Sequence, residues 1–195
     1  MKAVRAFIAI DLVPEAIQRL DDFSKQLQRE FGALPVRWIP VENMHLTLKF
    51  LGEVSEENLN VLTAMIRAEA SACPPFDLSI GGLGVFPNAK RPRVIWLGVE
   101  APAELGDFQR RIEGETIKLG YPPDKRSFSP HFTLGRVLRR ADRGEVQEIS
   151  QRLDQQKSDF IAASPVEAVH LYKSDLKSTG AVYTHLAAAQ LGSIK

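Results

Sequence analysis

Two short segments of this chain have the same pattern of side chains, His-apolar-Thr-apolar. The first segment is His45–Leu48 and the second is His131–Leu134. Strict alternation of polar and apolar residues is typical of a half-buried β-strand, in which residues two apart point to the same side. The histidine and the threonine of each segment are therefore predicted to share one face, while the apolar residues enter the core.

This pair of motifs has side chains suited to phosphoryl chemistry. One imidazole can donate a proton while another accepts one, and the unperturbed histidine pKa of about 6.5 supports both roles near neutral pH. The hydroxyls of Thr47 and Thr133 can donate hydrogen bonds to anionic oxygens. In-line displacement at phosphorus puts the attacking and leaving oxygens on opposite sides, where two histidines, His45 and His131, could serve them.

Two less specific interpretations of the motifs stay open. Short motifs often match by chance, so both histidines could be ordinary polar residues of half-exposed strands. Histidine is also a common zinc ligand, but neither copy has a second ligand at helical or turn spacing, and no cysteine pair or His-Glu cluster completes a coordination sphere. We therefore expect no metal site and no cofactor.

Both motifs lie within a longer repeat. From His45 to Phe86 there are 41 positions, and from His131 to Tyr172 there are also 41. Such regular spacing predicts two related units, each with a strand, a helix, a histidine strand, a helix and a hairpin. The expected strands are 4–12, 45–51, 76–86, 93–99, 131–138, 160–171 and 181–188, and the expected helices are 14–31, 55–66, 102–119 and 142–155.

This order of elements predicts an α+β fold. Two antiparallel sheets, with helices packed outside, would be related by a pseudo-twofold axis around a central groove. A doubly wound α/β fold also alternates helices and strands, but the strands joined by short loops and the lack of a Gly-rich phosphate turn favour the antiparallel arrangement. Residues 1–195 are expected to form a single domain made of two similar lobes.

The composition is that of an ordinary globular protein, with 44% hydrophobic and 25% charged residues. Lys and Arg number 25 against 24 Asp and Glu, so attraction to nucleic acid must come from local clusters of charge. Cys73 is the only cysteine, and no apolar run approaches the roughly 20 residues that cross a bilayer. We expect a cytoplasmic protein with no membrane partner and no obligate protein partner.

Two cations close to the motifs are candidate ligands for phosphate. Lys49 shares the predicted strand face of His45 and Thr47, so it is a candidate contact to a phosphate backbone. Arg136 follows His131 by five positions, an odd offset that needs a bulge or a strand end near Gly135 to bring it to the same face. The alternative for Arg136 is an ordinary surface charge.

Other residues near the motifs allow a functional and a structural interpretation. The basic segments 90–93 and 136–143 could contact phosphates or be solvated surface. Phe86 and Tyr172 could stack on a terminal base or pack against other side chains. We expect the two tryptophans, Trp38 and Trp96, in the core, and the two remaining histidines, His170 and His185, in structural or surface roles.

The sequence resembles the 2H phosphoesterases, a family defined by two His-x-Thr/Ser motifs. Within that family it is similar to the RNA 2′,3′-cyclic phosphodiesterases of bacteria and archaea, also described as 2′-5′ RNA ligases. The resemblance covers nearly the whole chain. Its matching segments are 5–9, 38–54, 130–136 and 171–176, followed by Gly180 and Tyr183.

The resemblance implies metal-independent hydrolysis of an RNA 2′,3′-cyclic phosphate to a 2′-phosphomonoester. His45 would be the general acid that protonates the departing 3′ oxygen, and His131 the general base that takes a proton from water. Thr47 and Thr133 would hold phosphate oxygens, and Arg136 would lie at the phosphate. Symmetry alone does not distinguish the acid from the base, so this assignment depends on the resemblance.

Two other functions remain alternatives. In the reverse reaction a 5′ hydroxyl replaces water and forms a 2′-5′ linkage, with tRNA fragments as candidate substrates. At about 55 M water, hydrolysis should prevail over ligation by mass action. The second alternative is a nucleotide-binding module without turnover, which has no need of two proton-transfer groups.

Overall fold

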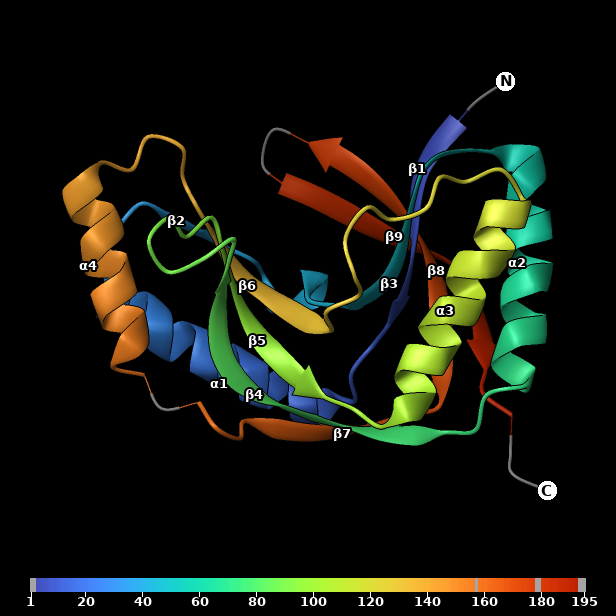
Figure 1. The fold of residues 1–195 in the computed structure, drawn as a ribbon, viewed down its shortest axis with the longest axis horizontal. Coiled ribbons are helices and arrows are strands. Elements are labelled where there is room, and N and C mark those ends of the chain that lie inside the picture. The colour runs from blue at the N-terminus through green and yellow to red at the C-terminus, as the bar shows by residue number, and fades with distance from the viewer. Residues whose placement is uncertain (1–2, 157, 178–179, 193–195) are drawn as a thin grey trace.

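The computed structural model describes residues 3–156, 158–177 and 180–192 (Figure 1). The chain begins with a strand and then alternates helices with strands, as the repeat predicted. The elements are β1 (Ala3–Ile10), α1 (Pro14–Phe31), β2 (Val36–Trp38), the 3₁₀ turn η1 (Val41–Asn43), β3 (Leu46–Ser55), α2 (Glu56–Ser71), β4 (Phe76–Phe86), β5 (Val94–Glu100), α3 (Ala103–Lys118), β6 (His131–Val137), α4 (Arg143–Asp154), β7 (Ala162–Val166), β8 (Ala168–Lys177) and β9 (Gly180–Gln190).

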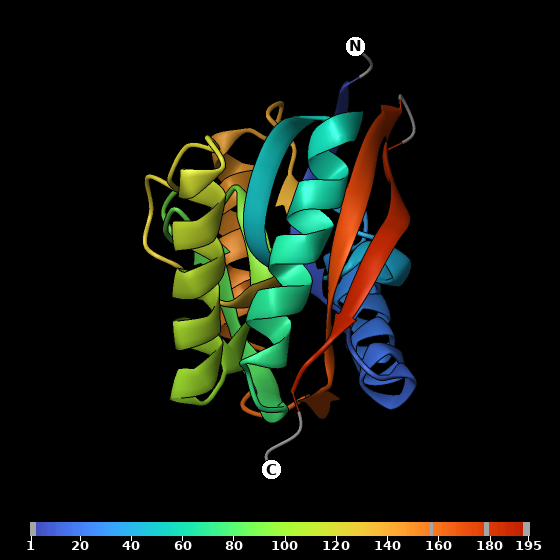
Figure 2. The ribbon, with the colours of Figure 1, turned by 90° about the vertical axis from the view of Figure 1, so that its right-hand side faces the viewer.

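The strands form two sheets, and the predicted α+β class is confirmed. One sheet has the order β3-β1-β8-β9 and the other the order β2-β6-β5-β4-β7. Every strand pair described in them is antiparallel. Helices α2 and α3 contact the four-stranded sheet, while α1 contacts β7 of the five-stranded sheet and also α4. Figure 1 shows the two sheets between these pairs of helices, and Figure 2 shows α2 and α3 side by side.

The internal repeat is visible in the order of the strands. The run β3-β1-β8 corresponds to the run β6-β5-β4, with a histidine motif at the start of β3 and of β6. The hairpin β8–β9 comes from the end of the chain but pairs with β1, and β4, from the first unit, pairs with β5. Each lobe is therefore assembled from both halves of the sequence.

One predicted strand is wrong. The alternating segment 160–171 forms two strands, β7 and β8, that belong to different sheets and are separated by Glu167. The buried side chains are those of residues 162, 164 and 166 in β7 but of residues 169 and 171 at the start of β8, so the alternation shifts by one residue where the chain crosses between the sheets. Pro165 lies in β7, which is an edge strand, where the missing backbone N–H costs no ladder hydrogen bond.

Local sequence signals account for the ends of the helices that support the sheets. Pro14 occupies the first turn of α1, and Gly32 ends this helix with φ 54°, a conformation that glycine adopts without strain. Asp142 and Glu145 form a capping box at the start of α4. Within the described residues, no helix is long and apolar enough to span a membrane.

Candidate active site

A β-bulge lies directly after the first motif. In the β1–β3 pair, Thr47 lies opposite Ala9 and Lys49 lies opposite Ile8, so Leu48 is an extra residue. A bulge shifts the alternation of the side chains that follow it. Lys49 consequently points to the helix-covered side of the sheet, and the prediction that it shares the face of the motif histidine and threonine is wrong.

Lys49 has a structural environment on that side. Its side chain is fully buried, and its Nζ lies 2.8 Å from Glu113 Oε1 and 2.8 Å from the carbonyl oxygen of Pro122. Asp124 Oδ2 is 3.8 Å away. The ammonium group thus connects β3 to α3 and to the loop after α3, and it is not available to a phosphate.

An equivalent bulge follows the second motif. In the β5–β6 pair, Thr133 lies opposite Trp96 and Gly135 lies opposite Ile95, so Leu134 is the extra residue. This is the bulge that the sequence required for the arginine five positions after the second histidine. We call the side of each sheet that carries the motif histidine and threonine its inner face.

Arg136 and Phe50 occupy matched positions on the two inner faces, each five residues after a motif histidine. Arg136 is exposed and lies opposite Val94, on the same face as Thr133. Phe50 lies opposite Phe7 and is 65% exposed. Sequence reasoning missed Phe50, although its spacing from the first histidine equals that of the arginine from the second.

The side chain of His45 is enclosed by aromatic rings and is only 9% exposed. Ring centroids of Phe7, Tyr172 and Tyr183 lie 6.0, 4.7 and 5.5 Å from its imidazole. Its Nδ1 is buried and has no hydrogen-bond partner within the described residues. Nε2 is therefore the nitrogen that can exchange a proton with a ligand, and it lies 3.5 Å from Asp11 Oδ1.

Asp11 links His45 to a second group of side chains on the same sheet. Its Oδ2 accepts a hydrogen bond of 2.6 Å from the hydroxyl of Tyr172 and lies 3.6 Å from His170 Nε2. Nδ1 of His170 lies 3.0 Å from Nε2 of His185. We had assigned His170 and His185 to structural or surface roles. They lie close to the site, with Asp11 between His45 and His170.

Burial governs the titration of this second group. Burial lowers the pKa of His170 below its usual value, and the negative charge of Asp11 only partly opposes that effect. Burial also raises the pKa of Tyr172, helped by its hydrogen bond to Asp11. Tyr172 is 8% exposed and stacks on Phe7 at 5.3 Å, so it packs within the site and does not offer a free face to a base.

His131 is half-buried and oriented by the backbone. Its Nδ1 lies 2.7 Å from the carbonyl oxygen of Ser129, which can only accept a hydrogen bond, so Nδ1 donates. The rings of Phe86 and Trp96 lie 5.0 and 6.2 Å away. Trp96 is thus on the inner face and not in the core, where we had predicted it.

The ring of Trp96 can pack beside His131 because Gly84, which lies opposite Trp96 on β4, has no side chain. A Cβ at Gly84 would lie 2.2 Å from Cζ2 of Trp96. The other tryptophan, Trp38, packs edge-on against Phe31 in the core, as predicted. The two motif strands, β3 and β6, are in contact with each other, so His45 and His131 come from adjoining strands.

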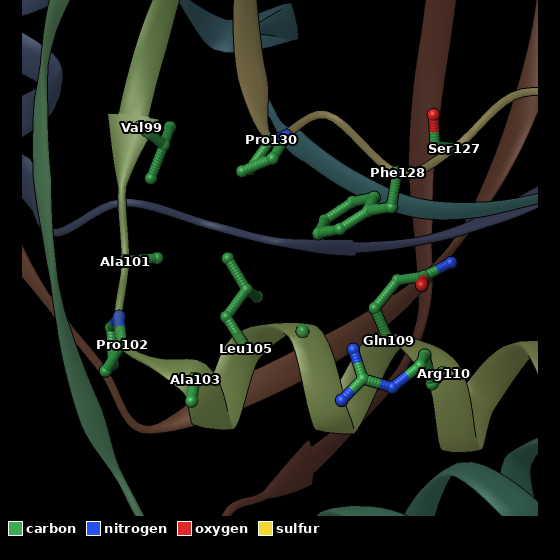
Figure 3. Close-up of a pocket in the computed structure, with 11 residues that line it drawn as sticks. Val99, Ala101, Pro102, Ala103, Leu105, Gln109, Arg110, Ser127, Phe128 and Pro130 are labelled. Atoms are coloured by element: carbon green, nitrogen blue, oxygen red, sulfur yellow. The ribbon is translucent and has the colours of Figure 1, made fainter.

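Two of the cavities outside the inner faces lie next to segments that the sequence singled out. One, of about 530 Å³, is under the loop that leads into His131, where Phe128 and Pro130 face Leu105 and Gln109 of α3 (Figure 3). None of the predicted site residues lines it. The cavity therefore belongs to the packing between this loop and α3.

The second cavity, of about 730 Å³, lies between the β4–β5 loop and the start of α4. Its charged lining consists of Lys90, Arg91, Arg93 and Arg143, with Asp142 as the acidic member. The two basic segments that the sequence indicated separately thus meet at one place. We call the cavity lined by these four cations the basic cavity.

Known proteins are similar to this chain in sequence and in architecture. A sequence profile described as LigT like Phosphoesterase matches twice, over residues 10–96 and 97–183, and each match contains one His-x-Thr motif. A protein of Methanothermobacter thermautotrophicus named RNA 2′,3′-cyclic phosphodiesterase is 35% identical over 191 residues, covering 96% of this chain and 99% of that protein. A protein of the same name from Archaeoglobus fulgidus is 33% identical, covering 94% and 98%.

Solved structures show the same fold. TT0787 of Thermus thermophilus superposes with a TM-score of 0.80 at 28% identity, covering 97% of this chain and 98% of that one. LigT of E. coli, solved in complex with 3′-AMP, superposes with a TM-score of 0.77 at 26% identity, covering 97% and 99%. The paired motifs, the matched bulges and these similarities along nearly the whole length agree: the chain belongs to the LigT-like phosphoesterase family.

Proposed function

We propose that this chain hydrolyses the 2′,3′-cyclic phosphate ends of RNA to 2′-phosphomonoesters without a metal ion. The observation that carries the proposal is the pair of His-x-Thr motifs, each followed by the same bulge, on adjoining strands of a LigT-like phosphoesterase. Relatives that are 33–35% identical over nearly the full length are named RNA 2′,3′-cyclic phosphodiesterases, which supports this substrate.

In the proposed reaction, His45 and His131 act on opposite sides of one phosphorus atom. His131 Nε2 takes a proton from water as the oxygen of that water forms a bond to phosphorus. His45 Nε2 gives its proton to the 3′ oxygen as the bond from phosphorus to that oxygen breaks. The hydroxyls of Thr47 and Thr133 donate hydrogen bonds to the non-bridging oxygens, whose negative charge grows in the transition state.

The matched positions after the motifs would hold different parts of the RNA. The guanidinium of Arg136 suits the phosphate, because it can donate two parallel hydrogen bonds to its oxygens. The exposed ring of Phe50 suits the terminal base, which can stack on it. The basic cavity would contact phosphates further along the strand, which makes RNA a better fit than a free mononucleotide.

The proposal is tested by the identity of the product. Purified protein in EDTA is given an oligonucleotide that ends in a 2′,3′-cyclic phosphate, and phosphorus NMR distinguishes the 2′- from the 3′-phosphate. We expect the 2′-phosphate alone, at a rate that EDTA does not change. A 3′-phosphate product, or activity that returns only when a divalent metal is added, would rule out the mechanism. Ends derived from cleaved tRNA and from unstructured RNA are compared in the same assay.

A further inference from the structure

Two exposed arginines lie directly opposite each other on the inner face of the five-stranded sheet. In the β2–β6 pair Arg37 lies opposite Arg136, and in the β5–β6 pair Arg136 lies opposite Val94. Residues that lie opposite each other in an antiparallel pair point to the same side, with Cβ atoms about 4.5–5.5 Å apart. Arg37 therefore lies beside Arg136 on the face that carries the second motif.

The neighbours of Arg37 along its strand fix the face to which it points. Val36 and Trp38, on either side of it, both pack against the hydrophobic core. Because side chains alternate along a strand, the residue between them must point away from the core. The backbone N–H of Ile39 donates to the carbonyl oxygen of Leu134, so the contact of this segment with β6 continues beyond the end of β2. Backbone pairing thus holds the two arginines side by side.

This arrangement has an electrostatic cost, because like charges directly opposite each other destabilise a sheet. Within the described residues, neither Arg37 nor Arg136 takes part in an ion pair that would offset the cost. In the other sheet, by contrast, Arg5 of β1 lies opposite Glu53. Two guanidinium groups side by side without a carboxylate are an arrangement that a bound anion would stabilise.

The position of Arg37 indicates which anion it would bind. Arg37 belongs to β2, the edge strand, so it lies one strand beyond Arg136, at the margin of the inner face. In the proposed reaction the cyclic phosphate carries one negative charge, and its oxygens already accept hydrogen bonds from Arg136 and the two motif threonines. The second guanidinium suits a second phosphate. In an RNA strand, the nearest one is the linkage on the 5′ side of the terminal nucleotide.

We propose that Arg37 binds the phosphate on the 5′ side of the terminal nucleotide, so that Arg37 and Arg136 hold two successive phosphates of one RNA strand. The inference rests on the proposed function, because it extends the same site from the reacting group to the linkage before it. It makes Arg37 a binding residue that favours an RNA end over a mononucleotide, which has no such linkage. Two other roles would give different results: Arg37 could join Arg136 at the reacting phosphate, or its charge could only keep the edge strand from pairing with another sheet.

The test uses two dinucleotides that end in a 2′,3′-cyclic phosphate and differ only in the linkage between their nucleosides. One has the natural phosphodiester, and the other has an uncharged methylphosphonate of nearly the same shape. The unaltered protein should open the charged dinucleotide with a kcat/KM about tenfold higher, the effect of one charge-assisted contact at an exposed site. Arg37→Gln should remove this preference, because it raises KM for the charged dinucleotide and leaves the uncharged one unaffected.

Two further variants serve as controls. Arg37→Lys should keep part of the preference, since an ammonium group cannot form two parallel hydrogen bonds to one phosphate. Arg67→Gln removes the same charge from an exposed position of α2 and should match the unaltered protein. An equal defect of Arg37→Gln with both dinucleotides would mean that Arg37 acts at the reacting phosphate, and it would overturn the inference. Equal rates of the unaltered protein on both dinucleotides would overturn it too.

The stability of Arg37→Gln separates binding from a structural role. Because the substitution removes one of two like charges, the urea concentration at the midpoint of unfolding should stay the same or rise. In gel filtration the variant should elute at the same volume as the unaltered protein. A lower midpoint would mean that the arginine supports the sheet, and a larger species would mean that it protects the edge of β2. Either result would contradict the proposed role.

A binding measurement without turnover distinguishes this inference from the proposed function. Titration calorimetry gives the affinity for a dinucleotide that ends in a 2′-phosphate and has the natural linkage, at several salt concentrations. Arg37→Gln should reduce the slope of log affinity against log salt by about 0.7, the value for one phosphate contact on a single strand. If cyclic phosphates are opened but this slope does not change, the inference about Arg37 is wrong. If the slope changes but no cyclic phosphate is opened, the proposed function is wrong.

Discussion

The surroundings of His45 and His131 differ more than the repeat that positions them. Both histidines precede a threonine by two residues and a bulge by three, on strands at matched places in the two sheets. His45 is enclosed by three aromatic rings and a carboxylate, whereas His131 is half-buried, between two rings, and held by a backbone carbonyl. The shared scaffold fixes where the imidazoles lie, and the neighbours give each one a different environment.

The same contrast holds at the two positions after each bulge. Lys49 is buried in ion pairs on one side, and its counterpart is Gly135, whose Cβ would meet Val36 at 2.9 Å. Phe50 is apolar, whereas its counterpart, Arg136, is positively charged. A substrate bound between the two inner faces would therefore meet an apolar ring on one side and a cation on the other, which selects one orientation of a nucleotide.

The largest expected effect is the loss of either imidazole. His45→Ala and His131→Ala should each lower kcat by about two to four powers of ten, the usual range for a missing general acid or base. A cyclic substrate with sulfur in place of the 3′ oxygen releases a thiolate, which needs no general acid, so it should rescue His45→Ala and leave His131→Ala inactive. If either variant kept full activity on the oxygen substrate, the pairing of the two lobes in one reaction would be wrong.

The buried ion pair of Lys49 should affect stability and not catalysis. Lys49→Met removes the cation that pairs with Glu113 and leaves only the backbone N–H of Asp124 as a donor to this carboxylate, so the free energy of unfolding should fall by about 3 kcal/mol in urea denaturation. The folded fraction should keep its kcat/KM. Adding Glu113→Gln to Lys49→Met should recover part of the lost stability. If the double variant is no more stable than Lys49→Met, the unpaired charge of Glu113 is not the cause of the loss.

Arg136 tests the cationic side of the comparison. Arg136→Ala should lower kcat/KM by about a hundredfold, because a charged donor to the transition state is lost. Arg136→Lys should recover only part of it, since an ammonium group cannot form two parallel hydrogen bonds. Arg67→Ala, which removes an exposed arginine from α2, is the control and should have no effect.

Phe50 tests the apolar side and should have the smallest effect. Phe50→Ala should raise KM about tenfold with little change in kcat, because base stacking contributes to binding in the ground state and the transition state alike. Phe160→Ala is a matched control, since Phe160 is 64% exposed outside the inner faces. An equal change in KM for both variants would remove Phe50 from the binding site.

Much of the fold could be predicted because its signals are local. Pro14 and Gly32 mark the ends of α1, and the alternation in each motif places its histidine and threonine on one face. The bulges could not be predicted, because they depend on how a strand pairs with its neighbour. This is why Lys49 was assigned to the wrong face, while Arg136 was assigned only on the condition of a bulge.

Asp11 was missed for a related reason. It lies 34 positions before His45, just beyond a strand whose apolar run gives no sign of a functional end. Only the antiparallel pairing of β1 with β3 brings the two together, and only the pairing of β1 with β8 adds Tyr172 and His170. Neighbours of a motif residue that come from distant strands are therefore the part of a site that local patterns reveal least.

The central claim is that the two imidazoles converge on one phosphorus atom. A crystal structure with a bound nucleoside 2′-phosphate, the proposed product, tests this claim most directly. We predict that Nε2 of His45 and Nε2 of His131 both lie within about 3 Å of oxygens on the same phosphate or on the ribose carbon next to it. A phosphate held by one histidine, with the other directed to a separate ligand or to solvent, would contradict the account.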